Sequence, residues 1–228
     1  MQKIMLAAMT LGFLFSPGAR AGTIFLTTTA EGWMTATGNN GAYAANNFVA
    51  GNCGAWDCYT GEFRNFFQFA IPALDGPILS ATLLLDTAFV ALKQSSPITY
   101  QVTSVGPDFG FSDLGTGTVY GSRTYTSSDR NRVEGITLDA AALADLLQAA
   151  GGGTFTLGGR VTSSVVFGPT RRDELLFGYT DTPQELEIVT GHSTTVQAQT
   201  SPVPEPAPAA LSAVGVLLIA LSRVKARM

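Results

Sequence analysis

Histidine is almost absent from this 228-residue sequence, which contains only His192. Hydrolases that use a serine or cysteine nucleophile need a histidine base beside it, and His192 stands in a polar segment that we interpret as solvated. The G-x-S-x-G elbow, the P-loop, the G-x-G-x-x-G fingerprint and the H-E-x-x-H zinc motif are absent as well. The sequence therefore offers no support for a triad hydrolase, a nucleotide-dependent enzyme or a zinc protease.

Cysteine is also scarce: the chain has Cys53 and Cys58, separated by four residues. Two thiolates are too few for a metal site, and the one histidine is far away in the sequence. In an exported chain, which enters an oxidising compartment, two nearby cysteines are expected to pair. The sequence therefore predicts a local Cys53–Cys58 disulfide and no metal site built on these cysteines.

Charged residues make up 13% of the chain, and basic ones are the rarer kind. Residues 22–200 include 16 acidic and eight basic side chains. Nucleic-acid binding needs a basic patch, so no nucleic-acid partner is expected. The acids are scattered and many stand beside turn residues, which indicates solvated turn positions. Two alternatives stay open, a carboxylate pair that hydrolyses glycosides and a Ca²⁺ ion held by such acids; no other cofactor is expected.

The N-terminus has the layout of a secretory signal peptide over residues 1–21. Lys3 supplies the positive charge, and the apolar run 4–15 that follows is too short to span a bilayer. Ala19 and Ala21 match the small-x-small cleavage rule, so we expect cleavage after Ala21. The partners implied are the Sec machinery and signal peptidase, and an uncut N-terminal anchor is the alternative.

The C-terminal segment 203–228 carries a second set of targeting features. Pro204, Glu205 and Pro206 form a proline-spaced motif. An uncharged apolar run follows at 207–222, which as a helix is about 24 Å long against roughly 30 Å of hydrocarbon. The basic tail 223–228 then favours an orientation with the chain end in the cytoplasm. This order predicts one short transmembrane helix, with a permanent tail anchor as the alternative to a temporary one.

The same order of Pro-Glu-Pro, short span and basic end resembles the PEP-CTERM sorting signal of exopolysaccharide-producing Gram-negative bacteria. The resemblance implies a protein that is exported, anchored transiently in the inner membrane and then cleaved by an exosortase-type enzyme. Its destination would be the cell surface or the extracellular matrix of a biofilm. The resemblance implies a cellular location and does not specify the chemistry of the exported domain.

Between the two signals, residues 22–191 read as short β-strands separated by Gly, Pro, Asn and Asp. Residues 62–71 and 78–87 alternate in polarity, which predicts that Phe67, Phe69, Leu83 and Leu85 lie in the core, with Phe66 interrupting the polar side. Residues 139–150 read as one short helix capped by an aspartate. A flexible stalk is expected at 192–202. The predicted fold is all-β, a two-sheet antiparallel β-sandwich with one helix.

The aromatic-rich segment 63–69, followed by a turn and the Ile-Leu-Ser-Ala-Thr-Leu strand from Ile78, looks like the core hairpin of jelly-roll domains of the DNRLRE or carbohydrate-binding-module kind. In those domains an aspartate usually stands where this chain has Ala70. The resemblance implies a jelly-roll-like topology. It implies little about the ligand, because jelly rolls host many functions.

The candidate ligand contacts are aromatic side chains expected in loops at one end of the sandwich: Trp33, Tyr43, Trp56 and Tyr59. Flat aromatic faces stack on sugar rings, and loops on a rigid scaffold often carry function. The alternative is that these rings pack against the end of the sandwich. The function we expect is structural or adhesive, with weak binding of exopolysaccharide and no enzymatic activity. The rival hypothesis is a carbohydrate-active hydrolase or lyase, and a third is an inert matrix component that binds no ligand.

Overall fold

A computed structural model describes residues 21–38, 40–41, 47–53, 61–92, 97–163, 174–178 and 183–191. The signal peptide up to residue 20, the stalk and the sorting segment lie outside these residues, so their predictions are untested. Within the described ranges, no helix is both long enough and apolar enough to cross a membrane.

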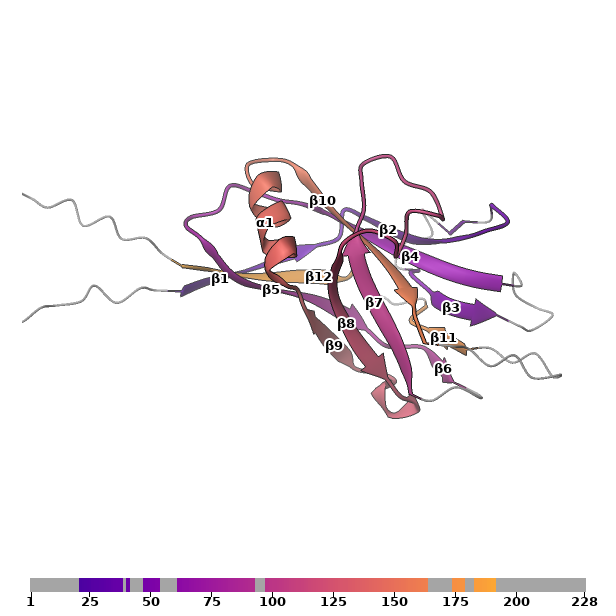
Figure 1. Cartoon of the computed structure of the whole chain (residues 1–228). Helices are drawn as coiled ribbons and strands as arrows, with labels where there is room; N and C mark the ends of the chain where they lie inside the picture. The colour runs from indigo at the N-terminus through magenta and orange to yellow at the C-terminus, as the bar shows by residue number, and fades with distance from the viewer. Residues whose placement is uncertain are drawn as a thin grey trace, which may run out of the picture. The chain divides into compact units, whose positions relative to one another are not determined.

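The chain is mostly β-structure, arranged in two antiparallel sheets with one short α-helix (Figure 1). The small sheet has the strand order β1 (Ala21–Thr27), β12 (Glu185–Gly191), β5 (Ile78–Asp86), β9 (Val133–Thr137). The large sheet has the order β6 (Val90–Leu92), β11 (Glu174–Leu176), β3 (Ala50–Cys53), β4 (Gly61–Ala70), β10 (Thr154–Val161), β7 (Ile98–Ser104), β8 (Val119–Tyr125). A further strand, β2 (Ala30–Thr35), pairs with the other side of β4. A 3-10 turn, η1 (Ser127–Asp129), precedes β9. The expected all-β class, with two antiparallel sheets and one α-helix among the described elements, is confirmed.

The core lies between the inner faces of the two sheets. Phe67 and Phe69 from β4 and Leu83 and Leu85 from β5 belong to one apolar cluster, and each is 0% exposed. The alternation of these two strands therefore predicted their buried sides correctly, because successive side chains of a strand point to opposite faces. Burial of apolar surface on this scale is the main term that stabilises such a fold.

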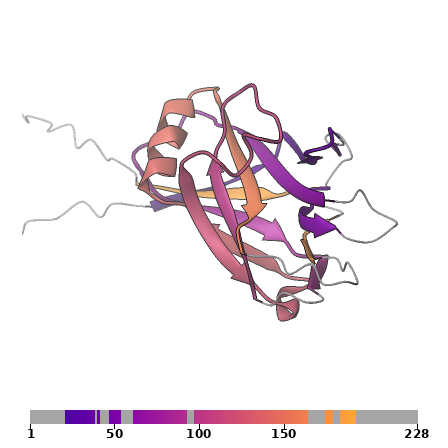
Figure 2. The ribbon, with the colours of Figure 1, turned by 45° about the vertical axis from the view of Figure 1, so that its right-hand side comes forward.

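The helix α1 (Ala140–Ala149) covers one end of the sheets beside β10 (Figures 1 and 2). Asp139 caps it by accepting hydrogen bonds from the backbone N–H groups of Ala141 and Ala142, both at 3.0 Å, which satisfies donors that have no partner inside the helix. Ala142 and Leu146 are its fully buried side chains. The predicted helix is confirmed at nearly its expected bounds.

The chain passes from the small sheet to the large one within two residues after β1. The backbone N–H of Thr28 donates to Gln184 O at 2.9 Å, which continues the ladder of β1 with β12. The next N–H, that of Thr29, donates to Gln68 O at 2.8 Å, beside β4. This change of sheet places β2 beside residues 63–68 of β4, where β2 forms one wall of the site described next.

Candidate functional site

The loop between β7 and β8, residues 105–118, folds back over the outer face of the large sheet. Arg64 on β4 holds it there: the guanidinium donates to the carbonyls of Leu114 at 3.0 Å and Phe111 at 3.3 Å, and its carbon lies 4.3 Å from the centre of the Phe111 ring. Glu62 fixes the same guanidinium with an ion pair of 2.8 Å. Because charge-assisted hydrogen bonds and cation–π contacts act together here, the loop is fixed relative to β4.

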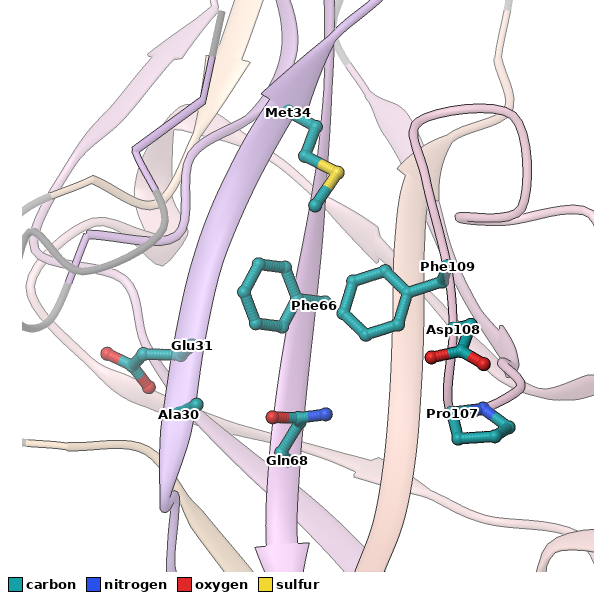
Figure 3. A pocket seen from close by; sticks show the side chains of 8 residues that line it. All are labelled: Ala30, Glu31, Met34, Phe66, Gln68, Pro107, Asp108 and Phe109. Atoms are coloured by element: carbon teal, nitrogen blue, oxygen red, sulfur yellow. The ribbon is translucent and has the colours of Figure 1, made fainter. Parts of the chain in front are cut away.

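An open groove of about 570 Å³ lies between this loop and β2, with β4 as its floor (Figure 3). We call it the β2–β4 groove; its lining residues are Ala30, Glu31, Met34, Phe66, Gln68, Pro107, Asp108 and Phe109. Figure 3 shows the rings of Phe66 and Phe109 at its centre, with Met34 at one end and Gln68 at the other. The two ring centres are 4.9 Å apart at an interplanar angle of 58°, a common aromatic pairing geometry.

The groove follows from the side chains that the two strands direct outward. On β4 the outward row is Arg64, Phe66 and Gln68, and opposite the last two β2 presents only Gly32 and Ala30. Small side chains on one strand beside larger ones on the next leave the surface hollow. Phe66, which interrupts the polar side of β4, is 5% exposed because Phe109 covers it.

Two carboxylates line the groove, but they differ in environment. Glu31 lies on the inward side of β2, where its Oε2 accepts hydrogen bonds from the Thr28 hydroxyl at 2.9 Å and the Gln184 N–H at 3.3 Å. Burial raises the pKa of the Glu31 carboxyl, and these two hydrogen bonds partly counter that shift. In Figure 3 this carboxylate points away from the Phe66 and Phe109 rings, whereas Asp108 stands exposed on the loop side.

The groove therefore presents an apolar centre flanked by one exposed carboxylate and one amide. A glycosidase needs two carboxyl groups that face the substrate roughly 5–10 Å apart, and Glu31 is directed elsewhere. No group of three metal-binding side chains occurs within the part of the chain that the structure describes. The arrangement suits contact with a sugar ring, which offers an apolar face and hydroxyls at its rim.

A second hollow, of about 550 Å³, lies between α1 and the strands β7, β8 and β10. The hydroxyl of Tyr120 donates to Asp145 across it, and the Tyr120 ring stacks on Phe155 at 5.9 Å. Burial, reinforced by Asp145, raises the pKa of Tyr120, so the hydroxyl stays protonated as a donor. This pair links the helix to β8, and we assign it a structural role.

Of the four aromatic residues proposed from sequence as ligand contacts, only Trp33 is described. It is 7% exposed and packs on Phe63 with ring centres 5.0 Å apart, in a small cluster with Cys53 and Leu175. Its ring is therefore used in packing, which was the alternative, and it offers little face to a ligand. Tyr43, Trp56 and Tyr59 lie outside the described residues.

Of the predicted disulfide, cleavage and sorting residues, the structure describes Cys53 and Ala21. Cys53 is 1% exposed and disulfide-bonded; Cys58 lies outside the described residues, so the pairing of the two stays a prediction. Ala21 is the first residue of β1. Ala19, Pro204, Glu205 and Pro206 are not described, so the structure leaves both cleavage proposals open.

The sequence analysis did not identify Met34, Phe66 or Phe109 as site residues. One feature of the sequence could have indicated the site: Phe66 breaks the alternation of β4. A large apolar side chain on the outer face of a strand is usually packed under another segment or in contact with a ligand. The segment that packs over Phe66 is a loop more than forty residues further along the chain; Arg64 and Phe111, which are in contact, are 47 residues apart in the sequence. A local pattern does not reveal such a contact.

No family model matches this chain, and no curated protein matches it. Among solved structures, a similarity is found to the K1 cleaved adhesin domain of Lys-gingipain from Porphyromonas gingivalis W83, at 12% identity, covering 74% of this chain and 96% of that one. The TM-score is 0.26. At that level the similarity carries no argument about the fold or function of this chain.

Proposed function

We propose that this chain is an exported protein of the cell surface or extracellular matrix, with a structural or adhesive role and weak binding of extracellular polysaccharide. The proposed polysaccharide binding rests on one observation, the β2–β4 groove. It combines the apolar side chains of Met34 and Phe109, the latter supported from below by the buried Phe66 ring, with the polar groups of Gln68 and Asp108. A groove open to solvent fits an extended polymer better than a small ligand that must be enclosed.

The proposed location outside the cytoplasm is inferred from the two ends of the sequence. Secretion through the Sec machinery and removal of residues 1–21 would deliver the domain outside the cytoplasm. The PEP-CTERM-like segment 203–228 would then hold it in the inner membrane until an exosortase-type enzyme cleaves near Pro204, Glu205 and Pro206. The acidic balance of residues 22–200 supports a polymer partner other than nucleic acid.

The proposed topology is a jelly-roll-like sandwich. Two antiparallel sheets packed on one core support it, as does the resemblance of the β4–β5 segment to jelly-roll hairpins. The hydrolase alternative is less favoured, because the groove holds one exposed carboxylate among the described residues rather than a facing pair.

The binding proposal is tested with purified exported protein against a glycan array and against exopolysaccharide isolated from the producing cells. Phe109→Leu preserves an apolar contact with Phe66 but removes the flat ring, so retention on polysaccharide is expected to fall several-fold. Phe89→Leu is the matched control, since that ring is 38% exposed but does not line the groove or contact Arg64. Equal binding by both variants and the unaltered protein would exclude the groove.

A hydrolysis assay on the same polysaccharide separates the two function classes. Binding without release of reducing ends supports the adhesive role. Release of reducing ends that is lost in Asp108→Asn would instead establish the hydrolase alternative, because removal of the carboxylate charge abolishes acid–base or nucleophilic catalysis.

A further inference from the structure

The strand β1 has an open edge. It pairs with β12 on one side and with no described strand on the other. The N–H of Thr28 donates to Gln184 O, so even-numbered residues of this ladder form the hydrogen-bonded pairs with β12. The backbone N–H and C=O groups of Thr23, Phe25 and Thr27 therefore point away from β12, toward the open edge.

Among the residues that the structure describes, this edge has none of the features by which proteins usually protect an edge strand. It contains no charged residue and no proline, and its pairing with β12 shows no bulge. Phe25 at its centre is 55% exposed. An uncharged, regular edge with an exposed aromatic side chain is a template for pairing with another strand.

The sequence of the edge indicates which strand fits it. Residues 23–27 read Thr-Ile-Phe-Leu-Thr, which is symmetric in residue class about Phe25. We propose that β1 pairs antiparallel with β1 of a second copy of this chain, about a two-fold axis at Phe25. The two small sheets then form one continuous sheet.

Every position of this pairing is complementary. Phe25 of one copy forms a hydrogen-bonded pair with Phe25 of the other. Thr23 of each copy pairs in the same way with Thr27 of the other copy, so the contact contains about six main-chain hydrogen bonds. On the inner face Ile24 lies beside Leu26 of the other copy, and both are only half-buried in one chain alone. Aromatic and Thr–Thr cross-strand pairs stabilise antiparallel sheets, and the two-fold contact is of the self-complementary kind usual for homodimers.

Electrostatics do not oppose the contact. The acidic residues nearest the edge in the ladder are Glu185 and Glu187 on β12, opposite Thr27 and Phe25. In the proposed pairing, the strand order is β12, β1, β1, β12, so the two Glu187 residues are three strand spacings apart, about 14 Å. That exceeds the Debye length of roughly 8 Å at physiological ionic strength, so the acidic surfaces are screened from one another.

The test is the oligomeric state of the purified exported protein, measured by sedimentation velocity over a concentration series. The unaltered protein is expected to dimerise. Phe25→Lys places two like charges at the two-fold axis, which is expected to weaken the dimer about tenfold or more. Leu79→Lys is the matched control: it makes the same change at a side chain that is 57% exposed on β5 of the same sheet, and the dimer should persist.

A second variant tests the register and does not depend on the lysine variant folding. Phe25→Cys places two cysteines at a directly opposed pair, where Cα atoms lie about 5.5 Å apart, within the range of a disulfide. A disulfide-linked dimer is expected from Phe25→Cys and not from Leu79→Cys. A protein that is monomeric at every concentration, or lysine variants that dimerise equally, would overturn the proposal.

Discussion

Tyr100 donates a hydrogen bond to Asn65 at the centre of the core, with 2.6 Å between Oη and Oδ1. Both residues are 0% exposed. Asn65 in turn donates from Nδ2 to the carbonyl of Phe48 at 2.7 Å. The pair thus joins β7 to β4 and to the segment before β3, and it satisfies polar groups that have no access to water.

Replacing Tyr100 with Phe is expected to lower the free energy of unfolding by about 1–3 kcal/mol, because Asn65 Oδ1 loses its partner inside the core. Tyr125→Phe is the matched control: this tyrosine is equally buried, but its hydroxyl has no hydrogen-bond partner among the described residues. That change should be neutral or stabilising. Urea unfolding measures both, and equal losses would show that the Tyr100–Asn65 bond contributes nothing specific.

Gly159 on β10 makes room for the same pair. A Cβ atom added there would lie 1.8 Å from Tyr100 Oη and 2.4 Å from Asn65 Oδ1. Gly159→Ala is therefore expected to destabilise the fold by more than about 2 kcal/mol, since a packed core cannot absorb the added methyl group without strain. At Gly106 an added Cβ would meet nothing within 4 Å, so Gly106→Ala should change the unfolding midpoint little.

Glu31 makes stability depend on pH in a defined direction. Burial raises the pKa of its carboxyl above the ordinary value of 4.5, so the folded state binds the proton more tightly than the unfolded state. The favourable contribution of the protonated carboxyl is present below 4.5 and is lost as the pH rises through the folded pKa. Glu31→Gln should therefore gain stability relative to the unaltered protein at neutral pH.

The gain of Glu31→Gln should shrink as the pH falls from above the folded pKa toward 4.5, because the native carboxyl is then protonated as well. Urea unfolding of both proteins across this range measures the difference. A gain for Glu31→Gln that grew on acidification would contradict the sign of the shift.

Both cysteine thiols of the exported protein are expected to resist alkylation until a reductant is added. Mass spectrometry after alkylation with and without dithiothreitol, followed by peptide mapping, measures which cysteines are joined. The expected product is a peptide pair joined through Cys53 and Cys58. Two freely alkylated cysteines would contradict the disulfide prediction.

Changing Pro204, Glu205 and Pro206 together to Ala is expected to abolish C-terminal processing. The prolines bar regular helix and strand, which would keep the motif extended for a protease outside the membrane; alanines would allow the apolar helix to continue through it. Intact mass and cell fractionation compare the variant with the unaltered protein. Normal trimming and release of the variant would favour a simple tail anchor or incidental cleavage.

The sequence was most informative where structure is local and periodic. Alternation identified Phe67, Phe69, Leu83 and Leu85 as core because a strand repeats every two residues. Alternation did not reveal that Trp33 would be buried, because β2 obtains its buried side from pairing with β4 and packing on Phe63. The β2–β4 groove could not be predicted for a similar reason, since it exists only once the 105–118 loop is fastened to Arg64.

The position of β12 between β1 and β5 determines how the domain would respond to tension. Its seven residues are in register with β1 along their whole length, and β5 pairs on the other side. If the domain binds a polymer as proposed, a force that pulls on Gly191 acts along the axis of β12. The hydrogen bonds of both ladders lie perpendicular to that axis, so they are loaded in shear and share the force together. This arrangement is expected to resist the extraction of β12 under tension, as the proposed adhesive role would require.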